Sequence, residues 1–341
     1  MEQDHLIDVH DLKTYFYLRE GVVKAVDGAS FSITRGKTTG VVGESGCGKS
    51  VTAQSIMQIV PRPGRIVSGQ ITFNYGVPAD GGKPTSVAIT DLSPQSSEMR
   101  AIRGSAIGMI FQEPMSSFSP VHTIGDQLSE TILLHQAVSK STAQDMVLEM
   151  MRHVGIANPE RNYAAYPHQL SGGMRQRAMI AMALMLRPSL LIADEPTTAL
   201  DVTTEAQILR LMRYLQQDLG MAIMFITHDL GVIAEMADDV VVMYLGRVVE
   251  AADVDAIFHD PKHPYLRALL RSIPRIGGKS GKRLAAIEGM VPNPLAIPPG
   301  CPFHTRCPEM MPGVCDEVVP NYTAFGDQHT VACHLYGREE R

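Results

Sequence analysis

The chain has 341 residues, of which 45% are hydrophobic and 19% are charged, a composition that excludes an intrinsically disordered protein. The formal net charge is −6 and the pI is near 6.1, which argues against nucleic-acid binding. The opening residues are acidic and polar, unlike a secretory signal, and no apolar run approaches the roughly eighteen residues of a membrane helix. At this length we expect two domains, or one large domain with an appendage, and any membrane role to be peripheral.

The first half of the chain predicts mainly β-structure. Strands are expected at 6–9, 24–26, 29–33 and 68–73, and a short buried strand at 39–42 precedes a helix over 50–59 that ends before Pro61. Segment 76–85 is rich in Gly and Pro and predicts a loop insertion. Another strand is expected at 107–111.

The second half predicts helices, then alternating strands and helices. Met146, Met150, Met151 and Val154 have helical spacing, which predicts an all-helical insert over about 115–170 with its methionines in the core. Strands at 190–193, 222–227 and 240–243 alternate with amphipathic helices, which indicates a largely parallel sheet. Beyond about 250, a Gly/Lys stretch at 277–282 and frequent prolines predict an appendage with little regular structure and no large core.

A glycine-rich turn after the strand at 39–42 matches the pattern G-x-x-x-x-G-K-[ST] of phosphate loops. Backbone N–H groups in such a loop, together with the following helix N-terminus, favour the negative charge of a β-phosphate. Lys49 is expected to reach the β- and γ-phosphates, and Ser50 to ligate Mg²⁺. The nucleotide-binding residues predicted here are Gly43, Glu44, Ser45, Gly46, Cys47, Gly48, Lys49, Ser50 and Val51.

Polar residues follow three other predicted strands. Asp194 and Glu195 end an apolar strand, where Asp194 suits the Mg²⁺ shell and Glu195 suits orienting or deprotonating the attacking water. His228 follows the next strand and is expected to contact the γ-phosphate. Gln112 ends the strand at 107–111 and is placed to contact Mg²⁺ or the attacking water. Glu195, His228 and Gln112 are therefore the predicted catalytic residues.

A second glycine-rich turn, Leu-Ser-Gly-Gly-Met-Arg-Gln at 170–176, opens a helix far along the chain from the phosphate loop. A helix N-terminus with two glycines attracts anions. We expect it to hold the phosphates of a nucleotide that is bound to another subunit.

In order and spacing, these motifs and Ala-Leu-Asp at 199–201 resemble the nucleotide-binding subunits of ABC transporters. The resemblance implies an α/β P-loop ATPase core with a helical insert, and two subunits that close head to tail around MgATP. It assigns Ser171, Gly172 and Gly173 to the nucleotide in trans and Asp201 to a cross-subunit contact. It also implies an aromatic residue that stacks on adenine, for which Phe16 aligns best and Tyr15 second.

The region after 255 resembles the tail of oligopeptide/dipeptide importer ATPases. The resemblance rests on His-Pro-Tyr-Leu-Arg-Ala-Leu-Leu at 263–270, Gly-Met-Val-Pro at 289–292 and Gly-Cys-Pro-Phe-His-Thr-Arg-Cys-Pro at 300–308. It implies an ATPase domain at 1–255, with the helical insert at about 115–170, and a C-terminal extension at 256–341.

The same resemblance implies partners and a location. The partners are a second ATPase subunit, identical or different, two transmembrane permease subunits and an extracytoplasmic solute-binding protein. A groove near Gln112 is expected to receive a cytoplasmic helix of the permease, at the cytoplasmic face of the membrane. Peptide is the default cargo, with nickel and oligosaccharides as alternatives.

Four cysteines lie in the extension, separated by five, seven and seventeen residues: Cys301, Cys307, Cys315 and Cys333. An ATP-binding chain is expected in a reducing compartment, where disulfides are disfavoured and clustered thiols are more often metal ligands. Thiolate ligation suits zinc or an iron–sulfur cluster. The resemblance extends a [4Fe-4S] cluster to these residues; zinc and reduced, partly buried thiols are the alternatives.

Two other classes of function also fit a nucleotide-binding chain. A soluble cassette ATPase that acts on ribosomes or DNA usually carries two cassettes in one chain or a coiled coil between the motifs, and the sequence has neither. A module that binds ATP without transport would not need both Glu195 and His228.

Overall fold

The computed structural model describes residues 4–76, 85–112, 117–198, 200–273, 287–326 and 328–337. Most of the predicted loop at 76–85 and the Gly/Lys stretch at 277–282 lie outside these ranges. So do residues 113–115 beside Gln112 and Ala199 in the Ala-Leu-Asp motif. Within the described ranges, each helix is too short or too polar to cross a bilayer.

An eight-stranded sheet forms the centre of the molecule, with the strand order β11-β12-β10-β9-β3-β8-β7-β6. The strands from β9 to β6 are parallel, as the strand–helix alternation predicts, whereas β10, β12 and β11 are antiparallel. The strands are β3 (Thr38–Val42), β6 (Ile107–Ile110), β7 (Leu190–Asp194), β8 (Ala222–Ile226), β9 (Asp239–Tyr244), β10 (Arg247–Asp253), β11 (Tyr322–Phe325) and β12 (His329–Ala332).

A second sheet is antiparallel and has the order β2-β1-β4-β5. Its strands are β1 (His5–Leu18), β2 (Gly21–Thr34), β4 (Gly64–Gly76) and β5 (Thr85–Ala88). The strands predicted at 6–9, 24–26, 29–33 and 68–73 all fall inside them. The observed strands β1 and β2 are longer than predicted and form one continuous hairpin. The outer half of this hairpin carries exposed residues, which have no clear apolar pattern and therefore do not predict a strand.

Two hydrophobic cores cover the two faces of the central sheet. Along β7, Leu190 and Ile192 face the core shared with the antiparallel sheet and α1, whereas Leu191 and Ala193 face the core shared with the other helices. Successive residues of a strand point to opposite faces, so a strand buried on both faces is apolar throughout, as β7 is up to Asp194.

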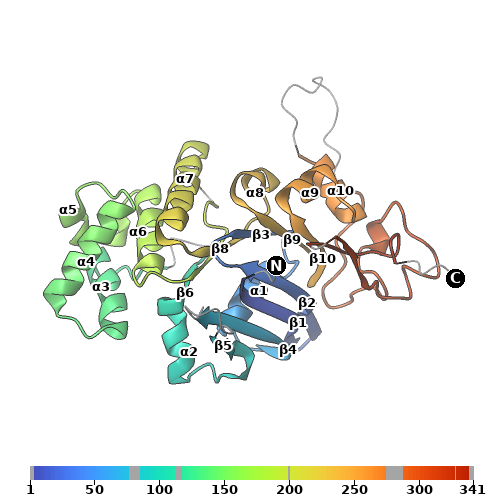
Figure 1. The fold of residues 1–341 in the computed structure, drawn as a ribbon, viewed down its shortest axis with the longest axis horizontal. Helices are drawn as coiled ribbons and strands as arrows, with labels where there is room; N and C mark the ends of the chain where they lie inside the picture. Colours follow the sequence, from blue (N-terminus) through green and yellow to red (C-terminus); the bar gives the residue numbers. More distant parts are fainter. Residues whose placement is uncertain are drawn as a thin grey trace.

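The helices outside the insert lie mainly on one side of the central sheet (Figure 1). They are α6 (Gly172–Leu184), α7 (Val202–Leu219), α8 (Leu230–Met236), α9 (Val254–His259) and α10 (Pro264–Arg271), while α1 (Lys49–Ile56) and α2 (Ser97–Ala101) lie toward the antiparallel sheet. Short 3₁₀ turns occur at Ile89–Asp91, Pro167–Gln169 and His304–Arg306, and an irregular helical turn at Ile102–Ala106.

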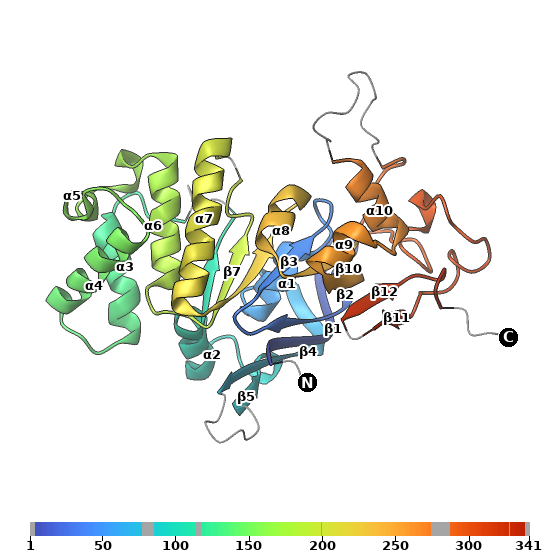
Figure 2. The same cartoon turned by 45° about the horizontal axis from the view of Figure 1, so that its top comes forward.

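The predicted helical insert consists of α3 (Ile124–His135), α4 (Lys140–His153) and α5 (Pro159–Tyr163). The hydroxyl groups of Thr123 and Ser139 cap α3 and α4 by accepting backbone N–H hydrogen bonds. Met151 is fully buried and Met146 and Met150 pack against the same core, as expected for methionines that fill space. Figures 1 and 2 show this helical region at the opposite end of the molecule from the C-terminal region.

The described part of the C-terminal region (256–341) contains more regular structure than the sequence predicts. β12 pairs with β10 and so extends the central sheet, and β11 pairs with β12 (Figure 2). Tyr265, Leu266 and Phe303 are fully buried and belong to the larger of the two cores. The prediction of an appendage without a large core is therefore wrong. Outside α10, whose apolar residues have helical spacing, the apolar residues of this region lie far apart in the sequence, so the core that they share gives no local signal.

Candidate functional site

The phosphate loop connects β3 to α1. At two of its positions a side chain larger than that of glycine would clash with the neighbouring backbone. Gly43 has φ 152° and Gly48 has φ 102°, both in the region that favours glycine. A Cβ on Gly43 would lie 2.2 Å from the carbonyl oxygen of Met243, and one on Gly48 would lie 2.3 Å from that of Ala25. The loop is thus packed between β9 and β2 and presents Ser45 and Gly46 at its exposed tip.

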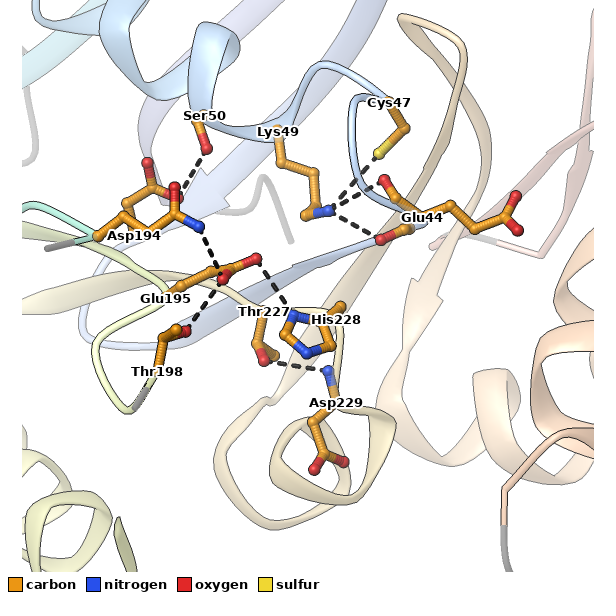
Figure 3. A network of polar contacts seen from close by, with 12 residues as sticks. Glu44, Cys47, Lys49, Ser50, Asp194, Glu195, Thr198, Thr227, His228 and Asp229 are labelled. Atoms are coloured by element: carbon orange, nitrogen blue, oxygen red, sulfur yellow. Dashed lines mark hydrogen bonds and ion pairs between the residues drawn. The ribbon is translucent and has the colours of Figure 1, made fainter. Parts of the chain in front are cut away.

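The loop holds Lys49 beneath it. The Lys49 ammonium donates to the carbonyl oxygens of Gly43 at 2.8 Å and Glu44 at 3.2 Å (Figure 3). Cys47 is buried beside it, and burial raises the pKa of its thiol despite the nearby Lys49 charge. Val51, in the first turn of α1, packs against the smaller core.

Ser50 lies at the start of α1 and reaches the end of β7. Its hydroxyl donates to a carboxylate oxygen of Asp194 at 2.9 Å. Burial raises the pKa of Asp194, and the adjacent Glu195 adds to the effect, while the hydrogen bond from Ser50 opposes it. A hydroxyl and a carboxylate side by side are the oxygen ligands that Mg²⁺ prefers.

Glu195 is the centre of a polar cluster at the carboxyl edge of the parallel strands (Figure 3). Gln112 donates to one of its oxygens at 3.0 Å, Thr198 donates to the same oxygen at 3.0 Å, and His228 Nδ1 lies 3.2 Å from the other. Burial alone would raise the pKa of Glu195, but the hydrogen bonds from His228, Thr198 and Gln112 outweigh burial and lower it. The carboxylate is therefore ionised and oriented.

The backbone at Glu195 supports a specialised role. Its φ is 47°, in the left-handed region that non-glycine residues rarely occupy. Its N–H donates to the Ile226 carbonyl at 2.9 Å, so pairing with β8 holds this conformation. Strained backbone of this kind is concentrated at functional sites.

Thr198 is a contact that sequence analysis missed. The residue lies in the turn after β7, and its N–H donates to the Glu195 carbonyl at 3.2 Å. A hydroxyl residue three positions after an acidic residue in a turn is the only local signal, and it is a common pattern.

The second glycine-rich turn is exposed at the start of α6. Ser171 caps the helix by accepting from the Met174 N–H at 3.3 Å, and Ser171 and Gly172 are exposed. Gln176, one turn further, is fully buried and donates to the Pro196 carbonyl oxygen. The turn is thereby connected to the segment that follows Glu195.

Three further predicted residues have defined local contacts. Asp201 caps α7 by accepting from Thr203 and Thr204, and these bonds lower its pKa. The Tyr15 hydroxyl donates to Asp27 at 2.5 Å. The ring of Phe16 lies over Gly64, where a Cβ would be 2.6 Å from it. The adenine contact of Phe16 stays a prediction.

The four C-terminal cysteines are free thiols, three of them buried. Burial raises the pKa of Cys301 to about 11 and that of Cys333 to about 12, and the neighbouring cysteines add to both shifts. Among the described residues, however, no group of three or more His, Cys, Asp or Glu side chains is placed to hold a metal ion. The thiols share one corner of the fold, but the structure does not support the [4Fe-4S] prediction.

Comparisons with known proteins decide the family. The ABC transporter family model matches residues 26–198. The chain belongs to the ABC transporter family. A second model, for the C-terminal region of oligopeptide/dipeptide transporters, matches residues 249–315. The chain is thus an ABC-type ATPase, the ATP-binding subunit of an oligopeptide/dipeptide-type ABC transporter.

Individual relatives agree over almost the full length. The chain is 49% identical over 331 residues to a probable peptide ABC transporter ATP-binding protein of Sinorhizobium fredii, covering 97% of this chain and 95% of that one. It is 46% identical to the dipeptide transport ATP-binding protein DppD of Bacillus subtilis, with the same coverage.

Solved ABC cassettes have the same fold. A dimeric bacterial ABC transporter cassette is 25% identical with a TM-score of 0.62, covering 73% of this chain and 98% of that one. The cassette cbiO1 of Clostridium perfringens is 27% identical with a TM-score of 0.61, covering 76% of this chain and 92% of that one.

Proposed function

We propose that this chain hydrolyses MgATP at the site around Lys49 and Glu195 to energise peptide import through a paired permease. The observation that carries this proposal is the Glu195 cluster, in which three side chains orient one ionised carboxylate beside the phosphate loop. The names of the relatives, which refer to peptide and dipeptide transport, support the cargo class.

The phosphate loop and α1 would bind the triphosphate. Backbone N–H groups of the loop and Lys49 would carry the negative charge of the β- and γ-phosphates. Asp194 and Ser50 would hold Mg²⁺, which neutralises charge on the phosphates during transfer. Phe16 would stack on the adenine.

Glu195 would orient and deprotonate the attacking water. Its lowered pKa keeps it ionised at neutral pH, and Thr198 and Gln112 fix the direction of one oxygen. His228 is mostly exposed on its other side, so it would reach the γ-phosphate while it orients Glu195.

Two subunits would close around the nucleotide. The exposed Ser171 and Gly172 and the half-buried Gly173, at the N-terminus of α6, would bind the phosphates held by the partner. Asp201 would contact the partner subunit. Loss of the bridging γ-phosphate on hydrolysis would let the subunits separate. The partner is an identical or a different ABC ATPase.

A groove beside Gln112 would receive the permease. Met57, Met109, Phe111, Thr131 and Met182 line it, and Phe111 is 45% exposed. Flexible methionines and an exposed aromatic ring suit an amphipathic helix of a partner. The subunit would then lie on the cytoplasmic face of the membrane, with a solute-binding protein delivering cargo from the other side.

The cysteine corner is a separate proposal within this function. Four thiols without disulfides have the donor chemistry of a [4Fe-4S] cluster, although their present arrangement makes no ligand set. Anaerobic purification with assays for iron, sulfide and absorption near 400 nm tests this. Zinc alone, or no metal, would end the cluster proposal and leave the ATPase proposal intact.

The Glu195→Gln variant tests the catalytic assignment in the transporter reconstituted with its permease and partner ATPase. ATP hydrolysis should fall by at least about 10²-fold, because a general base contributes that much, while ATP binding is kept. Glu235→Gln, the same change on the exposed surface of α8, is the matched control and should retain full activity. Unchanged hydrolysis in Glu195→Gln would exclude Glu195 as the base.

Uptake by the same proteoliposomes tests the cargo. ATP-dependent accumulation of labelled di- and oligopeptides is expected, with competition by unlabelled peptide. Competition by nickel or by oligosaccharides, and not by peptides, would overturn the peptide assignment.

A further inference from the structure

Glu44 brings a negative charge into the phosphate loop, and that charge would repel a polyphosphate ligand. In the structure its side chain points away from Lys49 (Figure 3). Its carboxylate instead forms a two-point ion pair with Arg306, with nitrogen–oxygen distances of 2.6 and 3.1 Å. Arg306 belongs to the C-terminal region, 262 residues further along the chain.

All three polar groups of Glu44 are engaged. Its carboxylate accepts from Arg306, its N–H donates to the hydroxyl of Tyr265 at 2.9 Å, and its carbonyl accepts from Lys49 at 3.2 Å. Two of these three partners come from the C-terminal region, and the third is the predicted phosphate-binding lysine. Glu44 therefore contacts both the C-terminal region and Lys49.

Arg306 is held firmly in place. Its side chain is 3% exposed, it donates to the Glu288 carbonyl and to the Tyr244 hydroxyl at 3.3 Å each, and its pKa is raised mainly by the bond to Glu44. A planar guanidinium that binds a carboxylate at two points fixes orientation as well as charge.

The support beneath this pair is an aromatic cluster. Tyr244, Tyr265 and Phe303 have ring centroids 4.7 to 5.3 Å apart, and all three are fully buried. Tyr244 ends β9, whereas Tyr265 and Phe303 come from the C-terminal region. The cluster thus ties the C-terminal region to the strand that packs against Gly43.

We propose that Arg306 and Tyr265 are positioning residues for nucleotide binding, which neutralise and anchor Glu44 so that the C-terminal region sets the affinity of the phosphate loop. The proposal rests on the assignment of this loop as the ATP site. Arg306 would act through charge as well as through geometry. Without Arg306, an unpaired Glu44 carboxylate would lie in the loop that receives the phosphates.

Binding of a fluorescent ATP, N-methylanthraniloyl ATP, to the purified full chain tests the proposal. Arg306→Ala should weaken binding by about tenfold or more, since it leaves a partly buried charge unpaired. In the assembled transporter the same variant should raise KM for ATP with little change in kcat, because Arg306 does not touch the reacting atoms. Arg306→Lys should recover part of the affinity.

The Glu44→Gln change gives the sharper test. Added to Arg306→Ala it removes the unpaired carboxylate, so the double variant should bind the fluorescent ATP more tightly than Arg306→Ala alone. Tyr265→Phe removes only the hydroxyl that accepts from Glu44 and should weaken binding by about two- to fivefold. Tyr265→Phe keeps the shape of the region and serves if Arg306→Ala does not fold.

Arg267→Ala is the matched control. Arg267 also lies in the C-terminal region and binds Glu309, Tyr336 and the Pro261 carbonyl, all within that region. Its loss should lower stability and leave nucleotide affinity within about twofold. Equal losses of affinity in Arg306→Ala and Arg267→Ala, with no recovery by Glu44→Gln, would show a merely structural role and overturn the proposal. A wild-type chain that does not bind the probe would instead refute the proposed function.

Discussion

The helical region and the C-terminal region are both attached to the same ATPase core, but in different ways. The helical region contributes Leu128 and Met151 to the larger core, and His153 of α4 makes a polar contact with Asp218 of α7. The C-terminal region contributes Tyr265 and Phe303 to that core, and it also pairs with the central sheet and contacts the phosphate loop. Both regions therefore pack into the same hydrophobic core, but the C-terminal region also contacts the phosphate loop.

The largest effect is expected from Phe303→Ala. Phe303 is fully buried between Tyr244 and Tyr265, so its loss should destabilise the protein by about 3–5 kcal/mol. Because those tyrosines support Glu44 and Arg306, KM for ATP should also rise. Leu128→Ala in α3 should destabilise by about 2–5 kcal/mol with KM unchanged.

Urea denaturation and ATPase kinetics on both variants check this pair. If the two variants changed KM equally, the distinction between the regions would not hold.

An effect of intermediate size is expected from pH. His263 is buried at the start of α10, and burial, with a contribution from the Arg267 charge, lowers its pKa from 6.5 to about 3. Between these two values the unfolded chain binds a proton that the folded chain does not, so stability falls as the pH falls below about 6.5. From pH 7 to pH 5 this group should cost about 2 kcal/mol.

His263→Asn removes the titrating group and keeps an oxygen that can cap α10. The urea midpoint of the variant should therefore depend less on pH than that of the wild type between pH 7 and pH 5. An identical pH dependence would exclude His263 as the source of the acid sensitivity.

The smallest effect is expected from single hydroxyl groups that lie away from the loop. Tyr322→Phe removes the hydrogen bond of β11 to the Val248 carbonyl, and Tyr163→Phe removes the one between α5 and Ser129. Each should lower stability by about 1 kcal/mol. Neither should alter KM for ATP, so a change in Tyr322→Phe would show that the C-terminal region acts on the site through more than Arg306 and Tyr265.

The sequence predicts the core of the site well for a physical reason. Asp194, Glu195 and His228 follow neighbouring parallel strands, and the carboxyl ends of such strands meet at one edge of the sheet. Lys49 and Ser50 reach the same edge through the loop after β3. Their order along the chain is therefore enough to predict that they lie together, and the structure brings them together.

Other contacts of the site depend on tertiary structure and leave no local pattern in the sequence. Glu44 and Arg306 meet only because the C-terminal region folds back on β9, and Thr198 reaches Glu195 only through the geometry of one turn. The burial of Phe303 likewise follows from tertiary packing. The sequence does not predict the antiparallel strands β11 and β12, because they are short and follow a proline-rich segment.

The pairing of β12 with β10 has a consequence for how the core avoids self-association. A strand at the edge of a sheet presents unpaired N–H and C=O groups that can pair with another chain. β10 carries the apolar, mostly buried residues Val248 and Val249, and without β12 it would form such an edge beside β9. In the full chain β11 forms the edge of the sheet instead. This strand has only four residues and carries an exposed Tyr322. The C-terminal region thereby also acts as a cap on the central sheet, so an ATPase core cut after α9 would be prone to aggregate.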